Sequence, residues 1–569
     1  MRSGAAIREP TNQAVLRGRE AATPSRSIGR ALRALAALAA FVGLVVLLDA
    51  ISRHAVPGNS DGATVILEGQ TFAHGNLMLR GWALSLDSFW LLDVLFYALF
   101  VAVVGIRPEL LNLVPAVIAA LVVVVSVRLA TIGARRGPAI AAAVCVIGLL
   151  ALPTQLLAYF FLQGPLHVAT ALWCLVAFLL LRRLRFGIAF GVAVILLATA
   201  MDSDLQALFF GSVPIGLAGL ALMLRRRSLR PGHVPVIAAL ASGVLGFALR
   251  EGARAIGTFY VNSPLNTLSR GEIPLNLHAV LHYTANLLGV GRSTAVTGGN
   301  AVWFENLHVI GLALFALGAL AALVRVVLGM LGGDLAGPSP EPLGRRSLTS
   351  RVLAPAEGSD LDAASDAFLD DTLLGALIAS GLIFIALTQQ AIWPYARYLT
   401  TAVIFGAILA ARLVARVLEG ERRRGVWMAV GGAGAVVVAL FAGSVAVNLR
   451  RPLPPQYAAG LATFLEQHHL SVGLGDYWSS SITTVESGGA VKIRPVIAGV
   501  NGRLIPYVRN SRPTWFTGRY QFFVFEPPTP FGNANQTAAE LTFGKPAQIY
   551  AIPGYIILVW STPHALPAA

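Results

Sequence analysis

Gly58-Asn-Ser-Asp-Gly-Ala-Thr-Val-Ile-Leu-Glu-Gly-Gln70 follows directly on the first apolar segment of the chain, and Gly81-Trp-Ala-Leu-Ser-Leu-Asp-Ser-Phe-Trp-Leu-Leu-Asp93 comes soon after it. The two pieces gather four acids, Asp61, Glu68, Asp87 and Asp93, in a chain with only 28 acids in 569 residues. Carboxylates at a bilayer surface are energetically expensive unless the protein uses them. The stretch 58–99 therefore predicts a functional loop, and the rest of the chain is interpreted as a membrane scaffold that holds it.

The composition is that of a polytopic membrane protein. Of 569 residues, 56% are hydrophobic and only 12% are charged, with a mean hydropathy of +0.69, whereas soluble domains carry about 25% charged residues. The net charge is +15, but the arginines lie in short clusters between apolar runs, which is typical of topology signals and not of a nucleic-acid surface. We therefore expect membrane lipids as partners and no nucleic acid.

The start of the chain predicts the orientation of the scaffold. Residues 1–30 are polar and basic, so we expect a disordered cytoplasmic tail. The apolar run 31–51 is long enough to cross a bilayer and lacks a small-residue cleavage site, which favours an uncleaved signal anchor. The loop 52–108 then begins outside. We interpret its apolar run 88–106 as a juxtamembrane helix in the outer interface, because a crossing there would turn the later arginine clusters outward.

The same charge rule predicts about eleven crossings in a transmembrane domain over residues 31–449. An outer loop is expected at 251–304, and a flexible cytoplasmic linker rich in Gly, Pro, Ser and Asp at 329–371. An odd number of crossings places the C-terminus outside. The expected spans are 31–51, 109–128, 138–155, 165–181, 186–201, 205–224, 233–250, 306–327, 372–388, 397–416 and 426–447.

Residues 450–569 have the composition of a soluble domain. The segment 457–469 shows helical apolar spacing, whereas Val491-Lys-Ile-Arg-Pro-Val-Ile497, Gln521-Phe-Phe-Val-Phe525 and Gln548-Ile-Tyr-Ala-Ile552 are patterned like strands. The fold prediction is therefore an all-α membrane bundle followed by a small extracytoplasmic α/β domain.

Short motifs in a characteristic order carry a resemblance to a known family. They are Asn59-Ser-Asp61 in the first outer loop, the acids of Asp87-Ser-Phe-Trp-Leu-Leu-Asp93, Pro108-Glu-Leu-Leu-Asn-Leu-Val-Pro115 at the next span, and Ala396-Arg397-Tyr398-Leu399 at a late span. In this arrangement the chain resembles the GT-C superfamily of membrane glycosyltransferases, in particular aminoarabinose transferases and protein O-mannosyltransferases. As architecture, the resemblance covers most of residues 30–450.

The resemblance implies a GT-C-like bundle with an active site on the non-cytoplasmic face. It also implies a donor sugar carried on a polyprenyl phosphate, and an essential Asp or Asp-Glu pair in the first outer loop. In this chain that role falls to Asp61 alone, because Gly62 stands where some members have a second acid. The second outer loop, 154–163, lacks the acid that several relatives place there.

Two aspartates are the catalytic candidates. Asp61 suits a general base, because a carboxylate at the mouth of a membrane cavity can acquire a useful pKa. The alternative is that Asn59, Ser60 and Asp61 only cap a helix that starts near Thr64. Asp87 is the second candidate. Its alternative role is to cap the helix that follows it.

The basic and aromatic candidates would hold the donor. Arg397 at the outer end of a span suits a phosphate, since a guanidinium grips phosphate through two parallel hydrogen bonds; snorkelling to the interface is the alternative. Trp82 is either an interfacial anchor or a sugar-stacking residue. The remaining donor-site candidates are Tyr398, His167, Arg292 and His278, with Arg254 as a weaker alternate to Arg397.

Met201-Asp202-Ser203-Asp204 joins two predicted spans at the outer face. Carboxylates spaced by two residues can ligate a hard cation such as Mg²⁺ or Mn²⁺, so Asp202 and Asp204 are candidate metal ligands. A tight turn capped by these side chains is the alternative.

These features predict an inverting glycosyltransferase of the bacterial inner membrane. It would transfer a sugar from a polyprenyl-phosphate donor to a glycan, lipid or protein acceptor of the envelope. Two alternatives stay open: a transporter or flippase for lipid-linked sugars, which would favour inverted repeats, and a non-catalytic scaffold that kept the bundle and lost the chemistry.

Overall fold

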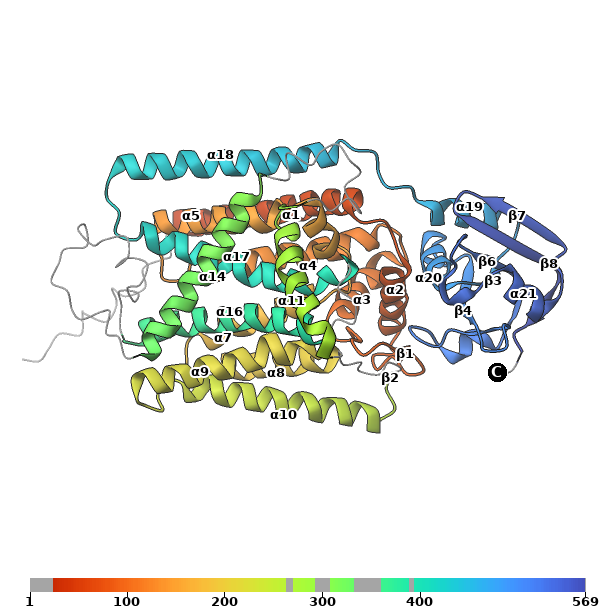
Figure 1. Ribbon diagram of the computed structural model, residues 1–569, viewed down its shortest axis with the longest axis horizontal. Coiled ribbons are helices and arrows are strands. Elements are labelled where there is room, and N and C mark those ends of the chain that lie inside the picture. The colour runs from red at the N-terminus through yellow and green to blue at the C-terminus, as the bar shows by residue number, and fades with distance from the viewer. Residues whose placement is uncertain (1–23, 262–269, 292–306, 332–359, 388–392, 568–569) are drawn as a thin grey trace, which may run out of the picture.

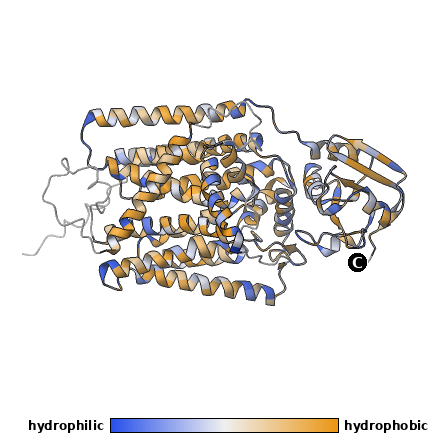
Figure 2. Ribbon diagram, in the orientation of Figure 1, coloured by the Kyte–Doolittle hydropathy of each residue, from blue (hydrophilic) through white to orange (hydrophobic). Residues whose placement is uncertain are grey.

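A computed structural model describes residues 24–261, 270–291, 307–331, 360–387 and 393–567. The described chain is a long helical bundle with a small α/β domain at one end (Figure 1). Apolar residues dominate the bundle helices along their length, whereas polar residues gather at their ends and in the α/β domain (Figure 2). This distribution is the one expected of a multi-pass membrane protein.

Eight helical segments are long and apolar enough to cross a membrane, among the residues that the structure describes. A ninth crossing would be a helix pair, Arg136–Ala151 and Gln155–Phe161, bent by 84°. The eight are α1 (Pro24–Ala55), α4 (Leu110–Ala130), η2 with α9 (Leu208–Ser212, Val213–Arg226), α10 (His233–Ala255), α14 (Val309–Met330), α16 (Asp360–Leu387), η5 with α17 (Trp393–Leu399, Thr400–Leu418) and α18 (Arg424–Leu449).

The two other expected spans are present as shorter helices. α7 (Val168–Leu181) has 14 residues and α8 (Ile188–Ser203) has 16, about 21 and 24 Å at 1.5 Å per residue, less than the roughly 30 Å of a hydrocarbon core. The predicted count of eleven is therefore not reached on length alone. His167 precedes α7 and Asp204 follows α8, so both side chains lie where the bundle is locally short.

Helices α2 (Ser60–Ala73) and α3 (Asp93–Val104) form the wall of the bundle that faces the α/β domain. With 12 residues, α3 is shorter than each of the eight candidate spans, and its place in the outer interface stays a prediction. Gly69 lets α2 approach α3 closely, because a Cβ at this position would lie 2.9 Å from the backbone nitrogen of Ala98.

A buried ionic cluster joins α14, α16 and α17 far from that wall. Arg412, only 2% exposed, donates from Nε to Asp370 at 2.6 Å and also contacts Asp366. Arg416 binds the same two acids, and Arg325 binds Asp370. Such charges are stable in a protein interior only when paired. Asp366 and Asp370 lie on α16, so the described end of the segment 329–371, which the sequence suggests as a flexible linker, is helical and paired with the bundle.

The α/β domain is built on a six-stranded sheet of order β5-β4-β3-β6-β8-β7. β3 pairs in parallel with both β4 and β6, and the remaining pairs are antiparallel. The three expected strands are β4, β6 and β7, and the expected helix 457–469 is α19. Bounds are α19 Tyr457–Gln467, β3 Val472–Gly475, α20 Tyr477–Glu486, β4 Lys492–Ala498, β5 Leu504–Pro506, β6 Arg519–Phe525, α21 Gln536–Phe543, β7 Gln548–Ile552 and β8 Tyr555–Ala565.

Candidate functional site

A cavity lies between the bundle and the α/β domain. The empty space between its walls is about 720 Å³, including the part open to solvent. Its lining brings together acids, bases and aromatic groups from five separate parts of the sequence: the face of α2, the loop before α3, the turn before α7, η5 directly before α17, and the loop after β5. Asp61, Asp87, His167, Arg397 and Tyr398, which the sequence singles out, all line this one cavity.

One face of α2 forms an acidic wall. Asp61, Thr64, Val65 and Glu68 line the cavity, and their spacing of three, four and seven residues places them on one side of a helix. The N-cap of α2 is Asn59, whose Oδ1 accepts from the backbone N–H of Gly62 at 3.0 Å. Asp61 is therefore not the capping residue, and its carboxylate faces the cavity.

Glu68 is a second carboxyl group in the cavity. From the sequence it is one of the acids of the stretch 58–99, with no role assigned to it. It is 3% exposed. Burial, reinforced by the charge of Asp61, raises the pKa of Glu68 well above 4.5. The seven-residue interval from Asp61 to Glu68 is the sequence signal that identifies it, because two helical turns return the chain to the same face.

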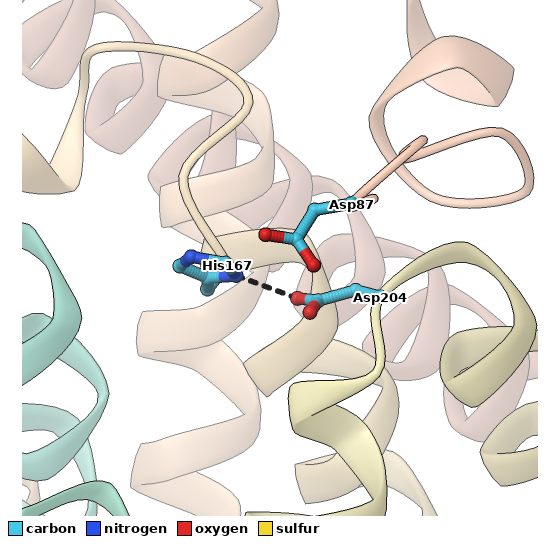
Figure 3. A group of neighbouring side chains, drawn as sticks. All are labelled: Asp87, His167 and Asp204. Carbon is cyan, nitrogen blue, oxygen red and sulfur yellow. Dashed lines mark hydrogen bonds and ion pairs between the residues drawn. The ribbon is translucent and has the colours of Figure 1, made fainter. Parts of the chain in front are cut away.

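Asp87, His167 and Asp204 converge from three loops (Figure 3). His167 Nδ1 lies 2.7 Å from Asp204 Oδ2, which also accepts from the Thr170 hydroxyl at 2.5 Å. The backbone N–H of Gln206 donates to Asp204 Oδ1 at 3.0 Å, and the Gln206 side-chain amide lies 3.0 Å from His167 Nε2. The pair is buried, with His167 3% and Asp204 0% exposed.

The electrostatics of this group follow from burial and mutual charge. Burial opposes charge on both His167 and Asp204, but their interaction prevails: it raises the pKa of His167 above 6.5 and lowers the pKa of Asp204 below 3.8. Burial, with the charge of Asp204, raises the pKa of Asp87 to about 6. The group therefore holds an ion pair beside a carboxyl whose pKa is raised to about 6.

Two cavity residues have left-handed backbone. His167 has φ 58° and Phe89 has φ 51°, a conformation that is uncommon for residues other than glycine and clusters at functional sites. Their rings lie 5.7 Å apart between centroids. The surrounding contacts fix both turns so that His167 faces the cavity and Asp204.

Arg397 lines the same cavity as Asp61, Glu68 and Asp87. Its guanidinium carbon lies 5.1 Å from the ring centroid of Tyr398 and 5.7 Å from that of Tyr395, and Nη2 donates to the Tyr398 hydroxyl at 3.3 Å. The Tyr398 ring lies 5.3 Å from the His167 ring. The aromatic rings orient a cation that carries further donors toward the cavity.

The α/β domain completes the cavity with residues that the sequence analysis missed. Arg509 and Asn510, in the loop after β5, line it, and the Tyr477 hydroxyl at the start of α20 donates to Asp61. These residues lie more than 400 positions beyond Asp61, as the separation of 416 between Tyr477 and Asp61 shows. No local pattern in the sequence indicates this contact.

Four predicted site residues among those that the structure describes are not in the lining: Trp82, His278, Asp202 and Asp204, the last of which contacts the lining residue His167. Trp82 is fully buried and packs edge-on against Trp515 of the α/β domain, with centroids 5.1 Å apart. His278 is exposed on α11 (Ile273–Leu287), where it stacks with His282. Asp202 lies at the end of α8 and is not part of the Asp87, His167 and Asp204 group. Arg292 lies outside the described residues.

The three-residue group has the geometry of a possible cation site. One ligand atom each from Asp87, His167 and Asp204 lies within 4.8 Å of the others. Asp204 thus remains a candidate ligand, but its partners are Asp87 and His167. The reason is conformational: Asp202 is helical, whereas Asp204 has left the helix with φ −152° and points elsewhere.

Comparison with solved structures finds a likeness to the oligosaccharyltransferase of Archaeoglobus fulgidus, in a crystal structure of its complex with Zn and sulfate. The sequence identity is 12% and the TM-score 0.41, over 85% of this chain and 67% of that chain. A likeness of this size assigns no activity to the present chain. No family model matches the sequence, and no curated protein matches it.

Proposed function

We propose that the chain is an integral membrane glycosyltransferase that moves a sugar from a polyprenyl-phosphate donor to an envelope acceptor, with Asp61 as general base. The observation that supports this most is the single cavity in which carboxyl groups of α2 and the Asp87 loop face the cations Arg397 and Arg509. Transfer from a phosphate-linked donor requires both groups at one place: a base for the acceptor and positive charge for the departing phosphate.

The reaction proceeds by displacement at the anomeric carbon of the donor. The acceptor hydroxyl oxygen forms a bond to that carbon, and the bond from the carbon to the phosphate oxygen breaks. Its electron pair stays on the polyprenyl phosphate. Asp61 takes the proton of the acceptor hydroxyl as the new bond forms. Attack opposite to the leaving group inverts the configuration at the sugar.

Arg397 holds the leaving phosphate in this proposal. Its guanidinium is fixed against Tyr395 and Tyr398 and retains donors for two phosphate oxygens. Arg509, from the α/β domain, lines the same cavity and adds a second positive charge. Charge that develops on the phosphate is stabilised by groups already in position, which avoids reorganisation during the reaction.

In this proposal the chemistry takes place beside a membrane surface. The charge rule puts the N-terminus in the cytoplasm and the α/β domain outside, at the outer face of a bacterial inner membrane. The apolar tail of the donor would remain in the lipid while its phosphate enters the cavity. The acceptor is a glycan, a lipid or a protein of the envelope, and membrane lipids surround the bundle.

We also propose that Asp87, His167 and Asp204 bind a divalent cation, Mg²⁺ or Mn²⁺. Their set of two carboxylates and one imidazole suits Mn²⁺ better, since Mg²⁺ prefers oxygen ligands alone. A bound cation would supply a further positive charge for the donor phosphate. Calorimetric titration of the purified protein with MnCl₂ tests this: Asp87→Asn should abolish binding and Asp202→Asn should retain it. Equal binding by both variants would contradict the assignment.

The transfer proposal is tested by mass spectrometry of lipid extracts and envelope glycans from cells that express single variants. With Asp61→Asn, sugar-loaded polyprenyl phosphate should accumulate and one envelope glycan should disappear. Asp49→Asn is the matched control, because Asp49 pairs with Arg53 on α1 and does not line the cavity. An unchanged glycan in Asp61→Asn cells would exclude Asp61 as the base.

The same experiment separates the two alternatives. If the chain were a flippase without transfer activity, its deletion would leave the loaded donor on the inner leaflet. The Asp61→Asn substitution would then leave the envelope glycan unchanged. A non-catalytic scaffold would give the same glycan profile with Asp61→Asn as with the unmodified chain.

A further inference from the structure

The first residue of α20 reaches from the α/β domain to the proposed base. Tyr477 follows β3 through Asp476, which caps α20: Asp476 Oδ1 accepts from the backbone N–H of Ser479 at 2.9 Å. The second carboxylate oxygen of Asp476 accepts from the backbone N–H groups of Glu526 at 3.3 Å and Phe531 at 3.4 Å. Three backbone donors thus fix the turn from which Tyr477 projects.

Two hydrogen bonds, one of them buried, hold α20 against α2 on either side of Asp61. The Ser60 hydroxyl donates to the backbone oxygen of Trp478 at 2.9 Å, and the Thr64 hydroxyl donates to Ser481 Oγ at 2.8 Å. Because Ser60 and Thr64 are one helical turn apart, these bonds set both the register and the rotation of α2 relative to α20. The position of Asp61 therefore depends on docking of the α/β domain.

Between these bonds, the Tyr477 hydroxyl donates to Asp61 Oδ1 and accepts from Asn510 Nδ2 at 3.3 Å. Tyr477 is only 4% exposed, and its ring is packed among those of Trp478, Tyr507 and Phe531. Burial, followed by the charge of Asp61, raises the pKa of Tyr477 well above 10. The hydroxyl is therefore protonated at neutral pH and acts as a donor.

We propose that Tyr477 is a positioning residue: its hydroxyl holds one oxygen of the Asp61 carboxylate, so that docking of the α/β domain completes the active cavity. This inference rests on the proposed function, in which Asp61 is the base. With Oδ1 engaged by Tyr477, Oδ2 is the oxygen that accepts the proton of the acceptor hydroxyl. A rigid carboxylate avoids the loss of rate that follows from small misplacements of a catalytic group.

Tyr477→Phe tests the hydroxyl alone, because the ring and its packing remain. We expect kcat for transfer to fall about tenfold or more, as for loss of a hydrogen bond to a charged group, with the donor KM little changed. The acid limb of the kcat profile should move to higher pH, since a hydrogen bond to the ionised form favours that form. Tyr520→Phe is the matched control: Tyr520 is 3% exposed in the same domain, and its hydroxyl donates to the backbone oxygen of Trp515 at 2.6 Å.

A second readout does not depend on transfer. Carbodiimide labelling of Asp61 in the purified full chain, quantified by peptide mass spectrometry, should be several-fold faster in Tyr477→Phe than in the unmodified protein and in Tyr520→Phe. Equal labelling in all three, or equal kcat and pH profiles in an active enzyme, would overturn the positioning role. An unmodified protein that performs no transfer would instead overturn the proposed function, whatever the labelling shows.

Discussion

Replacing Arg397 by lysine separates the shape of the guanidinium from its charge. The side chain is packed against Tyr395 and Tyr398 and donates to the Tyr398 hydroxyl at 3.3 Å, so its plane is fixed at the cavity wall. A planar guanidinium can offer two parallel donors to a phosphate, whereas an ammonium acts as a single point charge. Arg397→Lys therefore keeps the charge and removes the paired geometry.

The expected loss follows from one charge-assisted hydrogen bond. Such a bond contributes about 1.5–3 kcal/mol, and a loss of about 2 kcal/mol corresponds to a roughly thirtyfold weaker Kd. The assay is calorimetric titration of the purified protein in nanodiscs with farnesyl phosphate, a short prenyl phosphate. Farnesol, which lacks the phosphate, reports the apolar contribution and should bind the unmodified protein and Arg397→Lys equally.

Arg254→Lys is the control, because Arg254 is exposed on α10 and pairs with Glu251. It was the weaker alternate for the phosphate and does not line the cavity. We expect no change in farnesyl phosphate binding. A thirtyfold loss in Arg254→Lys with none in Arg397→Lys would refute the assignment of the phosphate to the cavity.

Three further predictions address the structure that supports the site. Gly69→Ala should lower stability by about 1–3 kcal/mol by overpacking, because its Cβ would meet backbone and Cβ atoms of α3 at 2.9–3.0 Å; thermal unfolding measures this, with Gly431→Ala, which meets no neighbouring atom within 4 Å, as a neutral control. Burial raises the pKa of Glu68, so the folded protein retains a proton that the unfolded chain releases above about pH 4.5. Stability therefore falls as pH rises above that value, and the gain in melting temperature from Glu68→Gln should be larger at pH 8 than at pH 5; a gain independent of pH would contradict this. Arg412→Met should cost about 3 kcal/mol by leaving Asp366 and Asp370 with fewer partners, and adding Asp370→Asn should recover part of the loss of thermal stability; additive losses would indicate that the pairing is not the cause.

The sequence predicts those site residues that are unusual among their immediate neighbours in the chain. Asp61 is an acid directly after an apolar segment, and Arg397 is a cation at the outer end of a predicted span, so each is unusual in its own surroundings. The structure brings both into one cavity. Glu68 has a signal of the same local kind, since it lies two helical turns after Asp61.

The remaining parts depend on tertiary contacts. Arg509 and Asn510 line the cavity, and Tyr477 reaches Asp61, because the α/β domain packs on the bundle, where α20 contacts α2. The metal hypothesis paired Asp202 with Asp204 by spacing, but a helix ends between them and the side chains diverge. Likewise, apolar length alone suggests a full crossing at 165–181, although His167 adopts a left-handed turn and α7 begins only after it.

The sequence predicted the helices of the bundle more closely than it predicted the residues of the site. Apolar runs bounded by arginine clusters predict helices whatever their neighbours, because backbone groups in a bilayer must be satisfied within the helix. The ionic cluster of α16 and α17 could not be anticipated in this way. From the sequence alone, Asp366 and Asp370 look like polar linker residues. Only the structure shows that Arg412 and Arg416 pair with them.

The most direct test of sugar transfer at this cavity uses proteoliposomes that contain the purified chain and polyprenyl-phosphate sugars extracted from bacterial membranes, with envelope acceptors added. Mass spectrometry follows the ratio of free to sugar-loaded polyprenyl phosphate. The unmodified protein and Asp49→Asn should release free polyprenyl phosphate together with a glycosylated acceptor, and Asp61→Asn should release neither. Equal release by the unmodified protein and Asp61→Asn, or no release by either, would contradict the account.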